Sequence, residues 1–313
     1  MLFRHFIENL SPSFDMCDPE KQFGTTVPRR AATCPPLMNA ILASSAKRWS
    51  KDRNFDALTG DRYHQKCLDA LIPALSNTAA LLDENLLAAI VILRYMEEID
   101  VPIGGTSFES HLLGTRIFIA AQDKLHDFTG LRMAAFWIAL RQEIVTAFIQ
   151  ARPVHANFAL DNMARFVVLS EDNDCGFANL TVIRCATCLR YCYGGEAQSV
   201  MAWESLRDSQ KQWWDSRPWT FYPTYSEDLK DTFFPEEVYL NEAVVTGVHH
   251  HFLAEVLLEA HNPKIPKLGP GQAIGLRQTN TNIKELVRRI CGIAEVCAVR
   301  LHIAPSFPPP CFN

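Results

Sequence analysis

Apolar residues recur at helical spacing along most of this chain. In residues 84–99, Leu86, Ile90 and Leu93 mark one stripe, while Leu87 and Val91 fill the neighbouring positions. A helix that is apolar on most of its sides is usually buried. This segment is therefore predicted to be a central helix of the core.

Similar patterns, separated by strong helix breakers, predict about nine helices. Among the breakers are Gly104-Gly105, Arg152-Pro153 and the connector from Pro263 to Gly271, and a proline disfavours helical geometry in the residue before it. The predicted helices cover residues 36–50, 56–76, 84–99, about 106–123, 130–151, 174–193, 197–215, 235–261 and about 272–300.

Polar residues at the predicted helix starts support these boundaries. Thr106 and Glu109 form a capping-box pattern, in which the hydroxyl and the carboxylate each bind an amide of the first turn. The cluster 172–174 (Asp-Asn-Asp) suits the start of the helix at 174. Residues 217–235 break the periodicity with prolines and aromatic side chains and are predicted to be a long ordered loop.

No alternating strand series and no fixed-period repeat accompanies the helical segments. The predicted fold class is therefore all-α, with a single large helical domain over residues 1–300 and a disordered tail at 301–313 that is rich in proline. Residues 1–34 are predicted to be an irregular or short-helical lead-in to this domain.

Composition and charge favour a soluble intracellular protein. The 48% apolar and 21% charged fractions are ordinary for a folded chain, and the formal net charge of −5 gives no support to nucleic-acid binding. The longest apolar run, 86–93, is too short to cross a bilayer. Without a signal-peptide pattern at the start, the ten cysteines are expected to be reduced.

Two clusters in the sequence contain residue types that bind metal ions. Cys185, Cys188 and Cys192 share one helical face, but the further ligands that zinc needs at short spacing are missing, so a buried helical face is the preferred interpretation. His249-His250-His251 lies within a predicted helix, where consecutive side chains diverge by about 100°. One of the three is expected to face the core, and no metal ligand is assigned.

Enzyme motifs are equally incomplete. Gly269-Pro270-Gly271 lacks the strand of a dinucleotide loop, and the acidic clusters at 97–100 and 171–174 do not form the paired-aspartate motif of isoprenoid synthases. No catalytic residue and no cofactor is assigned. The remaining enzyme hypothesis is a convergence of titratable groups in a pocket, for which the candidates are His111, Arg141, Glu143 and His250.

Taken as strings, seven segments resemble the C-terminal regulatory domain of fungal-specific transcription factors, of the ARCA type. They include DENLLAAIVILRYMEEIDVPI at 83–103 and AAFWIALRQEIVTAFIQARPV at 134–154. The seven segments are residues 2–49, 61–76, 83–103, 110–122, 134–154, 234–271 and 285–294.

The resemblance implies an all-helical domain that lies downstream of a zinc binuclear-cluster DNA-binding module in the intact family members. That module is absent from this sequence, and the family pattern ends after about Ile293. The expectation is a nuclear regulatory domain that acts through protein partners. The expected partners are the transcription machinery, another regulator, or a second copy of the chain in a homodimer. It is expected to bind neither DNA by itself nor a membrane. The alternatives are a small-molecule sensor and an all-α enzyme.

Overall fold

The computed structural model describes residues 1–52, 55–100, 109–122, 129–160, 173–195, 199–228 and 233–300. Contacts between Cα atoms divide the chain into two compact units. Unit 1 comprises residues 1–146 and 155–159, and unit 2 comprises residues 147–154 and 160–313. The predicted tail at 301–313 lies outside the described residues, and the single domain over 1–300 stays a prediction.

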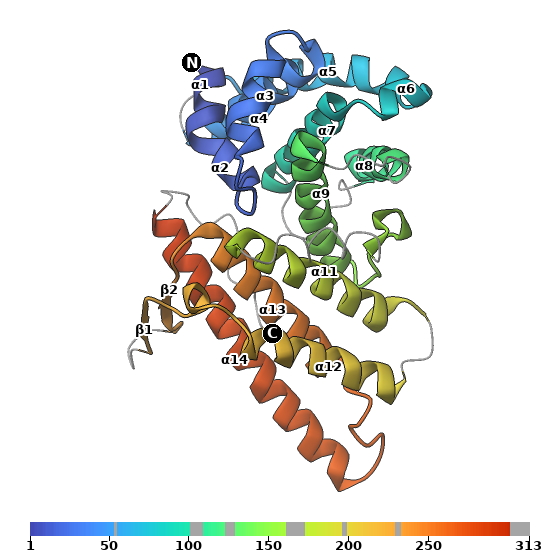
Figure 1. Ribbon diagram of the computed structural model, residues 1–313, viewed down its shortest axis with the longest axis vertical. Coiled ribbons are helices and arrows are strands. Elements are labelled where there is room, and N and C mark those ends of the chain that lie inside the picture. Colours follow the sequence, from blue (N-terminus) through green and yellow to red (C-terminus); the bar gives the residue numbers. More distant parts are fainter. Residues whose placement is uncertain are drawn as a thin grey trace. The chain divides into compact units, whose positions relative to one another are not determined.

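Unit 1 is built from helices (Figure 1). Helix α4 packs against α5 and α7, and the short N-terminal helices pack along α4. The elements are α1 (Leu2–His5), the π-helical turn η1 (Phe6–Leu10), α2 (Ser11–Phe14), α3 (Gln22–Ala31), α4 (Pro35–Asp52), α5 (Ala57–Ala74), α6 (Thr78–Leu81), α7 (Glu84–Asp100), α8 (Glu109–Gln122), α9 (Gly130–Ile149) and the 3₁₀ turn η2 (Ala156–Phe158). The predicted short-helical lead-in is confirmed.

The N-terminal part of unit 1 is held together by aromatic rings and one buried carboxylate. Phe14 lies 5.1 Å from Phe23 and 4.7 Å from Tyr95, measured between ring centroids. Asp15, next to it, accepts hydrogen bonds from the amides of Phe23 (2.9 Å) and Gly24 (2.7 Å) in the first turn of α3. The carboxylate thus pairs amides that have no partner within the helix, and burial raises the pKa of Asp15 to about 6.

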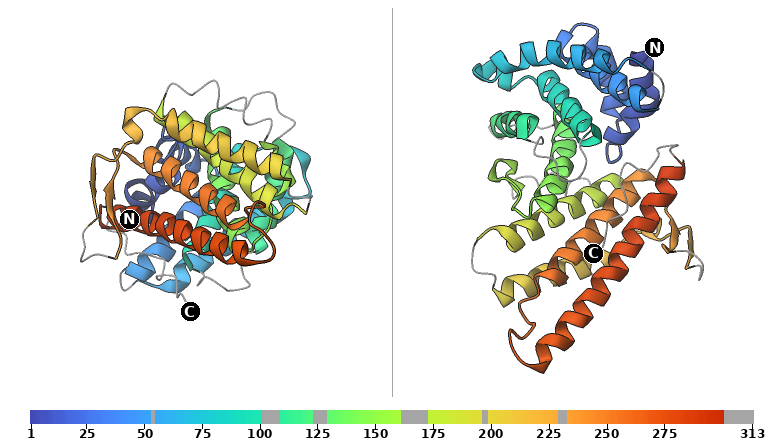
Figure 2. Two further views of the ribbon diagram at one scale, coloured as in Figure 1. Left: turned by 90° about the horizontal axis from the view of Figure 1, so that it is seen from below. Right: turned by 180° about the vertical axis from the view of Figure 1, so that it is seen from behind.

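The described residues of unit 2 form four long helices and a small antiparallel sheet (Figure 2). Helices α11 and α13 pack face to face, α12 packs on α13, and α14 lies along α13 and β2. The elements are α11 (Asp174–Tyr193), α12 (Val200–Asp215), the 3₁₀ turn η3 (Trp219–Phe221), β1 (Tyr225–Glu227), β2 (Glu236–Val238), α13 (Glu242–Ala260) and α14 (Pro270–Arg300).

A glycine permits the close packing of α13 on α11. A Cβ atom at Gly247 would lie 2.8 Å from a ring carbon of Phe221 and 3.2 Å from Ala178. On the same side of the core, the fully buried Trp213 stacks on Phe177 at 4.8 Å. The small residues bring the two helix backbones together, and the rings fill the remaining space.

The all-α fold class is confirmed for the described residues, which contain one sheet of two short strands. Ten helices of ten residues or more occur in them, against about nine predicted. They are α3, α4, α5, α7, α8, α9, α11, α12, α13 and α14. In the part of the chain that is described, no helix is both long enough and apolar enough to span a bilayer.

One predicted helix boundary in unit 2 is wrong, and the loop predicted before it contains regular elements. The helix predicted from residue 235 begins at Glu242, because residues 236–238 pair with 225–227 and the side chain of Asn241 caps the helix through the amide of Val244. The loop predicted over 217–235 therefore contains η3 and β1. The cap at Asn173 is confirmed, since its side chain accepts from the amide of Gly176, whereas Thr106 of the predicted capping box lies outside the described residues.

Candidate functional site

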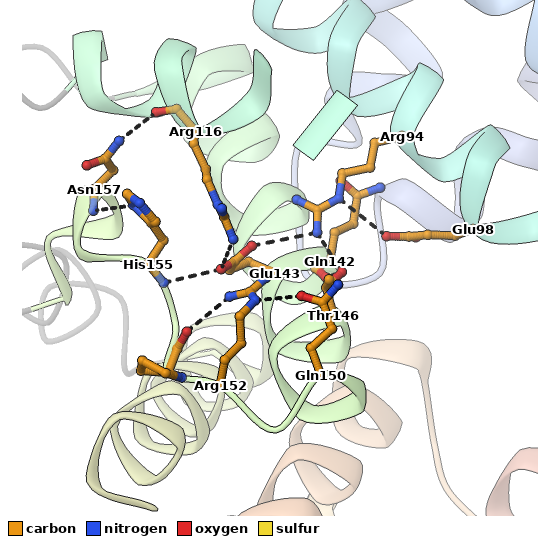
Figure 3. A network of polar contacts seen from close by, with 11 residues as sticks. Arg94, Glu98, Arg116, Gln142, Glu143, Thr146, Gln150, Arg152, His155 and Asn157 are labelled. Atoms are coloured by element: carbon orange, nitrogen blue, oxygen red, sulfur yellow. Dashed lines mark hydrogen bonds and ion pairs between the residues drawn. The ribbon is translucent and has the colours of Figure 1, made fainter. Parts of the chain in front are cut away.

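A network of polar contacts in the interior of unit 1 centres on Glu143 of α9 (Figure 3). Apolar residues occupy most of this helix, yet the Glu143 side chain has no solvent exposure. A buried carboxylate remains charged only if cations and hydrogen-bond donors surround it. The neighbouring helices α7 and α8 provide the cations.

Two arginines and one backbone amide contact the Glu143 carboxylate. Arg116 Nη2 of α8 lies 3.3 Å from Oε1, and Arg94 Nη2 of α7 lies 3.8 Å from Oε2. The amide of His155, in the turn that precedes η2, donates to Oε1 at 3.2 Å. One carboxylate thereby connects three helices and a turn.

Arg94 extends the network along α7 and α9. Its Nη2 donates to Thr146 Oγ1 at 2.8 Å, and its Nε lies 3.7 Å from Glu98 Oε1. Burial raises the pKa of Glu98 to about 7, although the Arg94 charge and a hydrogen bond with Gln142 oppose the shift. This carboxyl therefore changes its charge near neutral pH.

The turn at η2 is fixed by a second set of hydrogen bonds. The amide of Asn157 donates to His155 Nδ1 at 3.3 Å, so this ring nitrogen carries no proton, and Asn157 Nδ2 donates to the carbonyl of Arg116 at 3.1 Å. Arg94 and Arg116 face the carboxyl groups of Glu143 and Glu98 across the network. Because these groups bind each other, the arrangement favours holding helices in place over activating a substrate.

The titratable cluster proposed from the sequence is distributed over several elements. Arg141 Nη2 donates to the carbonyl of Phe14 at 3.1 Å and so serves packing within unit 1. His250 belongs to unit 2, where its Nδ1 lies 2.7 Å from the carbonyl of Thr246. The side chain of His111 lies outside the described residues.

Sequence reasoning missed the partners of Glu143. Arg94 and Glu98 stand in a largely apolar predicted helix, and charged residues at such positions are rarely buried without a partner. That signal could have identified α7 as one side of a polar network. Nothing in the residue spacing connects Arg94 with Arg116 or with His155.

The cysteine face of α11 is buried, as the sequence indicates. Cys188 Sγ lies 3.8 Å from Gln210 Nε2, and Cys192 Sγ lies 3.6 Å from the carbonyl of Leu257. Burial raises the pKa of Cys192 to about 12, and it also raises the pKa values of Cys185 and Cys188. Protonated thiols are poor nucleophiles and poor metal ligands.

Among the histidines at 249–251, His251 faces the core, as expected for one of the three. Its ring stacks on Trp214 at 4.7 Å and on Trp213 at 5.1 Å, and its Nδ1 lies 3.1 Å from Gln210 Oε1. Burial lowers the pKa of His251 to about 3 and that of His249 to about 4, so both rings are neutral at pH 7. Within the described ranges, no group of three or more His, Cys, Asp or Glu residues is placed to hold a metal ion.

A cleft of about 920 Å³ lies in unit 2, where the ends of α11 and α13 meet the connector to α14. Its polar lining includes His261, Asn262, Lys267 and Gln272, and its apolar lining includes Tyr193. The ring of Tyr193 packs edge-on against His261 at 4.9 Å. The cleft is open to solvent, and its lining mixes aromatic and polar groups in similar measure.

Unit 2 also carries exposed aromatic side chains in the sequence from η3 to the residues just before β2. Trp219 is 77% exposed and Phe233 is 76% exposed, and the rings of Tyr222 and Tyr225 are about half exposed. Aromatic side chains are enriched in protein–protein interfaces.

The comparison with known families identifies the chain. The family model of the fungal specific transcription factor domain matches residues 1–170, which is more than half of the sequence. The chain belongs to this family, and the family recognised from the sequence strings is confirmed. No curated protein and no solved structure matches the chain.

Proposed function

We propose that this chain is a regulatory domain of a fungal transcription factor that acts in the nucleus through protein contacts. The main observation in support of the proposal is the family match over residues 1–170, which indicates transcription regulation. Partners of the expected kind are components of the transcription machinery or another regulator. The predicted homodimer stays a prediction.

The chemistry of the buried groups supports a role in binding over a role in catalysis. In unit 1 the charges of Glu143, Arg94 and Arg116 are directed at each other, and in unit 2 the buried thiols and histidines are neutral. The exposed rings of unit 2 offer apolar area to a partner. The formal charge of −5 opposes binding of this chain to the phosphates of DNA.

A tethering assay tests the proposal. The full chain is fused to an unrelated DNA-binding domain and placed upstream of a reporter gene in fungal cells. A reproducible rise or fall in reporter expression, relative to the DNA-binding domain alone and to a fusion with an unrelated helical protein, is the expected result. Expression equal to that of both controls, with the fusion present in the nucleus, would refute the regulatory role.

The absence of DNA binding is tested separately. The purified chain is incubated with a pool of random duplexes at about 0.15 M salt, and bound sequences are selected and read. We expect no enriched sequence. Enrichment of a defined site bound with nanomolar affinity would show that the chain reads DNA itself.

The cleft of about 920 Å³ favours a small-molecule sensor as the second candidate function. A ligand that binds the folded state and not the unfolded state raises the free energy of unfolding, by an amount that grows with the logarithm of its concentration above Kd. A thermal-shift screen with fungal metabolites is expected to find compounds that raise the melting temperature, and Tyr193→Ala should abolish the shift. A panel of metabolites without effect would count against this candidate.

A further inference from the structure

The two faces of the small sheet in unit 2 differ in what they contact. The register pairs Tyr225 with Val238, Ser226 with Glu237 and Glu227 with Glu236. Because residues directly opposite in an antiparallel pair point to the same side, two faces follow. The inner face carries the buried Glu237, and the outer face carries Tyr225, Glu227, Glu236 and Val238.

The inner face binds an arginine of the same chain. Arg289 of α14 makes two bonds to Glu237, with Nε 2.6 Å from Oε1 and Nη2 3.0 Å from Oε2. Tyr239 donates to the same carboxylate at 2.7 Å, and the guanidinium carbon lies 4.3 Å from the centre of the Phe252 ring. A carboxylate, a tyrosine hydroxyl and an aromatic ring thus recognise one guanidinium.

The outer face repeats part of this chemistry without an arginine. Tyr225 donates to Glu227, two positions along the strand, as Tyr239 does to Glu237. Glu227 stands directly opposite Glu236, and two like charges at such positions destabilise a sheet. In the described part of the chain, no lysine or arginine forms an ion pair with either carboxylate, since the nearby Arg288 pairs with Asp228 and Glu285.

Aromatic rings in the same region already bind a second guanidinium. Arg217 lies between Trp214 and Tyr222, with its guanidinium carbon 3.9 Å and 4.1 Å from the ring centres. Trp219, three residues before Tyr222, is the most exposed of the neighbouring rings. The face of an exposed aromatic ring attracts a cation, as the two rings around Arg217 do.

We propose that the outer face of the β1–β2 sheet docks an arginine-rich segment of a partner protein. The proposal rests on the proposed function, because it names the partner chemistry of a domain that works by protein contact. A guanidinium inserted between Glu227 and Glu236 removes their repulsion and makes paired bonds to carboxylate oxygens. Nucleic acids and anionic lipids are disfavoured, since their phosphates would be repelled by the same two charges.

Arginine fits this face better than lysine does. The planar guanidinium stacks on rings and binds carboxylates through two parallel bonds, whereas an ammonium is a compact and strongly hydrated charge. Both internal examples in this part of unit 2, Arg289 and Arg217, use the guanidinium in these ways. The partner segment is therefore expected to discriminate between the two residues.

The test uses a fluorescently labelled twelve-residue peptide with four arginines, and matched peptides in which these are lysine or the neutral citrulline. Binding to the full chain is followed by fluorescence anisotropy at low salt. We expect the arginine peptide to bind, the lysine peptide to bind more weakly and the citrulline peptide not to bind. The double variant E227Q/E236Q should weaken binding of the arginine peptide about fivefold. This change corresponds to about 1 kcal/mol for the two exposed ion pairs together.

A charge-matched variant separates this site from general attraction to an acidic protein. D208N/E295Q removes two exposed carboxylates of α12 and α14 and should leave the affinity unchanged. Equal losses in the two double variants, or no binding of the arginine peptide, would overturn the docking proposal. A dimer that is detected by analytical ultracentrifugation and lost in E227Q/E236Q would also overturn it, because the occupant would then be a second copy of the chain.

The tethering assay separates failure of the docking surface from failure of the proposed regulatory function. A fusion that alters reporter expression while the peptide fails to bind would leave the regulatory role standing and remove the docking surface. Conversely, a peptide that binds as expected to a chain without effect on the reporter would support the surface alone. The fold of E227Q/E236Q is checked by its thermal unfolding, which should be no less cooperative than in the original chain.

Discussion

Replacing Glu143 by glutamine should destabilise unit 1 strongly, although the two side chains have nearly the same shape. Glutamine retains an oxygen that can accept from the amide of His155, so the variant removes charge and little else. Arg94, 4% exposed, and Arg116, 20% exposed, then lose the carboxylate that they share. Breaking a buried pair by removal of one partner costs about 3–5 kcal/mol.

We expect a loss near the lower limit, about 3 kcal/mol, because Arg94 keeps Thr146 and Glu98 as partners. Domains of this kind have a total stability of about 5–15 kcal/mol, so the effect is large. Urea denaturation followed by far-ultraviolet circular dichroism measures the free energy of unfolding. Hydrogen exchange at the amide of His155 then locates the weakened region.

A surface pair provides the matched control. Arg4 Nε and Glu8 Oε1 lie 2.8 Å apart, closer than either contact of Glu143, but their side chains are 80% and 52% exposed. Glu8→Gln should leave the unfolding midpoint unchanged, because water screens an exposed pair. If Glu143→Gln lowers the free energy of unfolding by less than about 1 kcal/mol, or by no more than Glu8→Gln does, the Glu143 network does not stabilise unit 1 in the way predicted.

Two further predictions concern the pH dependence of stability and the packing of α14 next to the small sheet. Burial raises the pKa of Glu98 from 4.5 to about 7, so its contribution to stability is complete below pH 4.5 and is lost as the pH rises through 7. Glu98→Gln should remove this pH-dependent loss of stability between about pH 5 and 8. A melting temperature whose pH profile is the same in the variant as in the original chain would contradict the raised pKa of Glu98. A Cβ atom at Gly292 of α14 would lie 2.0 Å from the carbonyl oxygen of Pro235. Gly292→Ala should therefore lower the free energy of unfolding by about 2 kcal/mol, because the chain before β2 must shift. A Cβ atom at Gly271 would lie 3.3 Å from a side-chain carbon of Pro266, so Gly271→Ala should be tolerated. Equal stabilities of the two variants would refute the close approach at Gly292.

Local sequence determined most of the helices of this protein. The apolar spacing in residues 84–99 and 130–151 places α7 and α9 within two residues of their observed ends. Helix periodicity and caps such as Asn173 involve neighbours three or four residues apart, so a short window of sequence contains the whole signal. The family likewise follows from strings of residues, as the match over 1–170 shows.

Tertiary structure alone decided which polar groups meet. Glu143 is 27 residues from Arg116 and 49 from Arg94 in the sequence, so only the packing of α7, α8 and α9 reveals their shared site. The same holds for Glu237 and Arg289, 52 residues apart, and for the strand pairing that moves the start of α13 from 235 to 242. Contacts at such separations depend on how whole elements pack, because no local spacing encodes the distance between two helices.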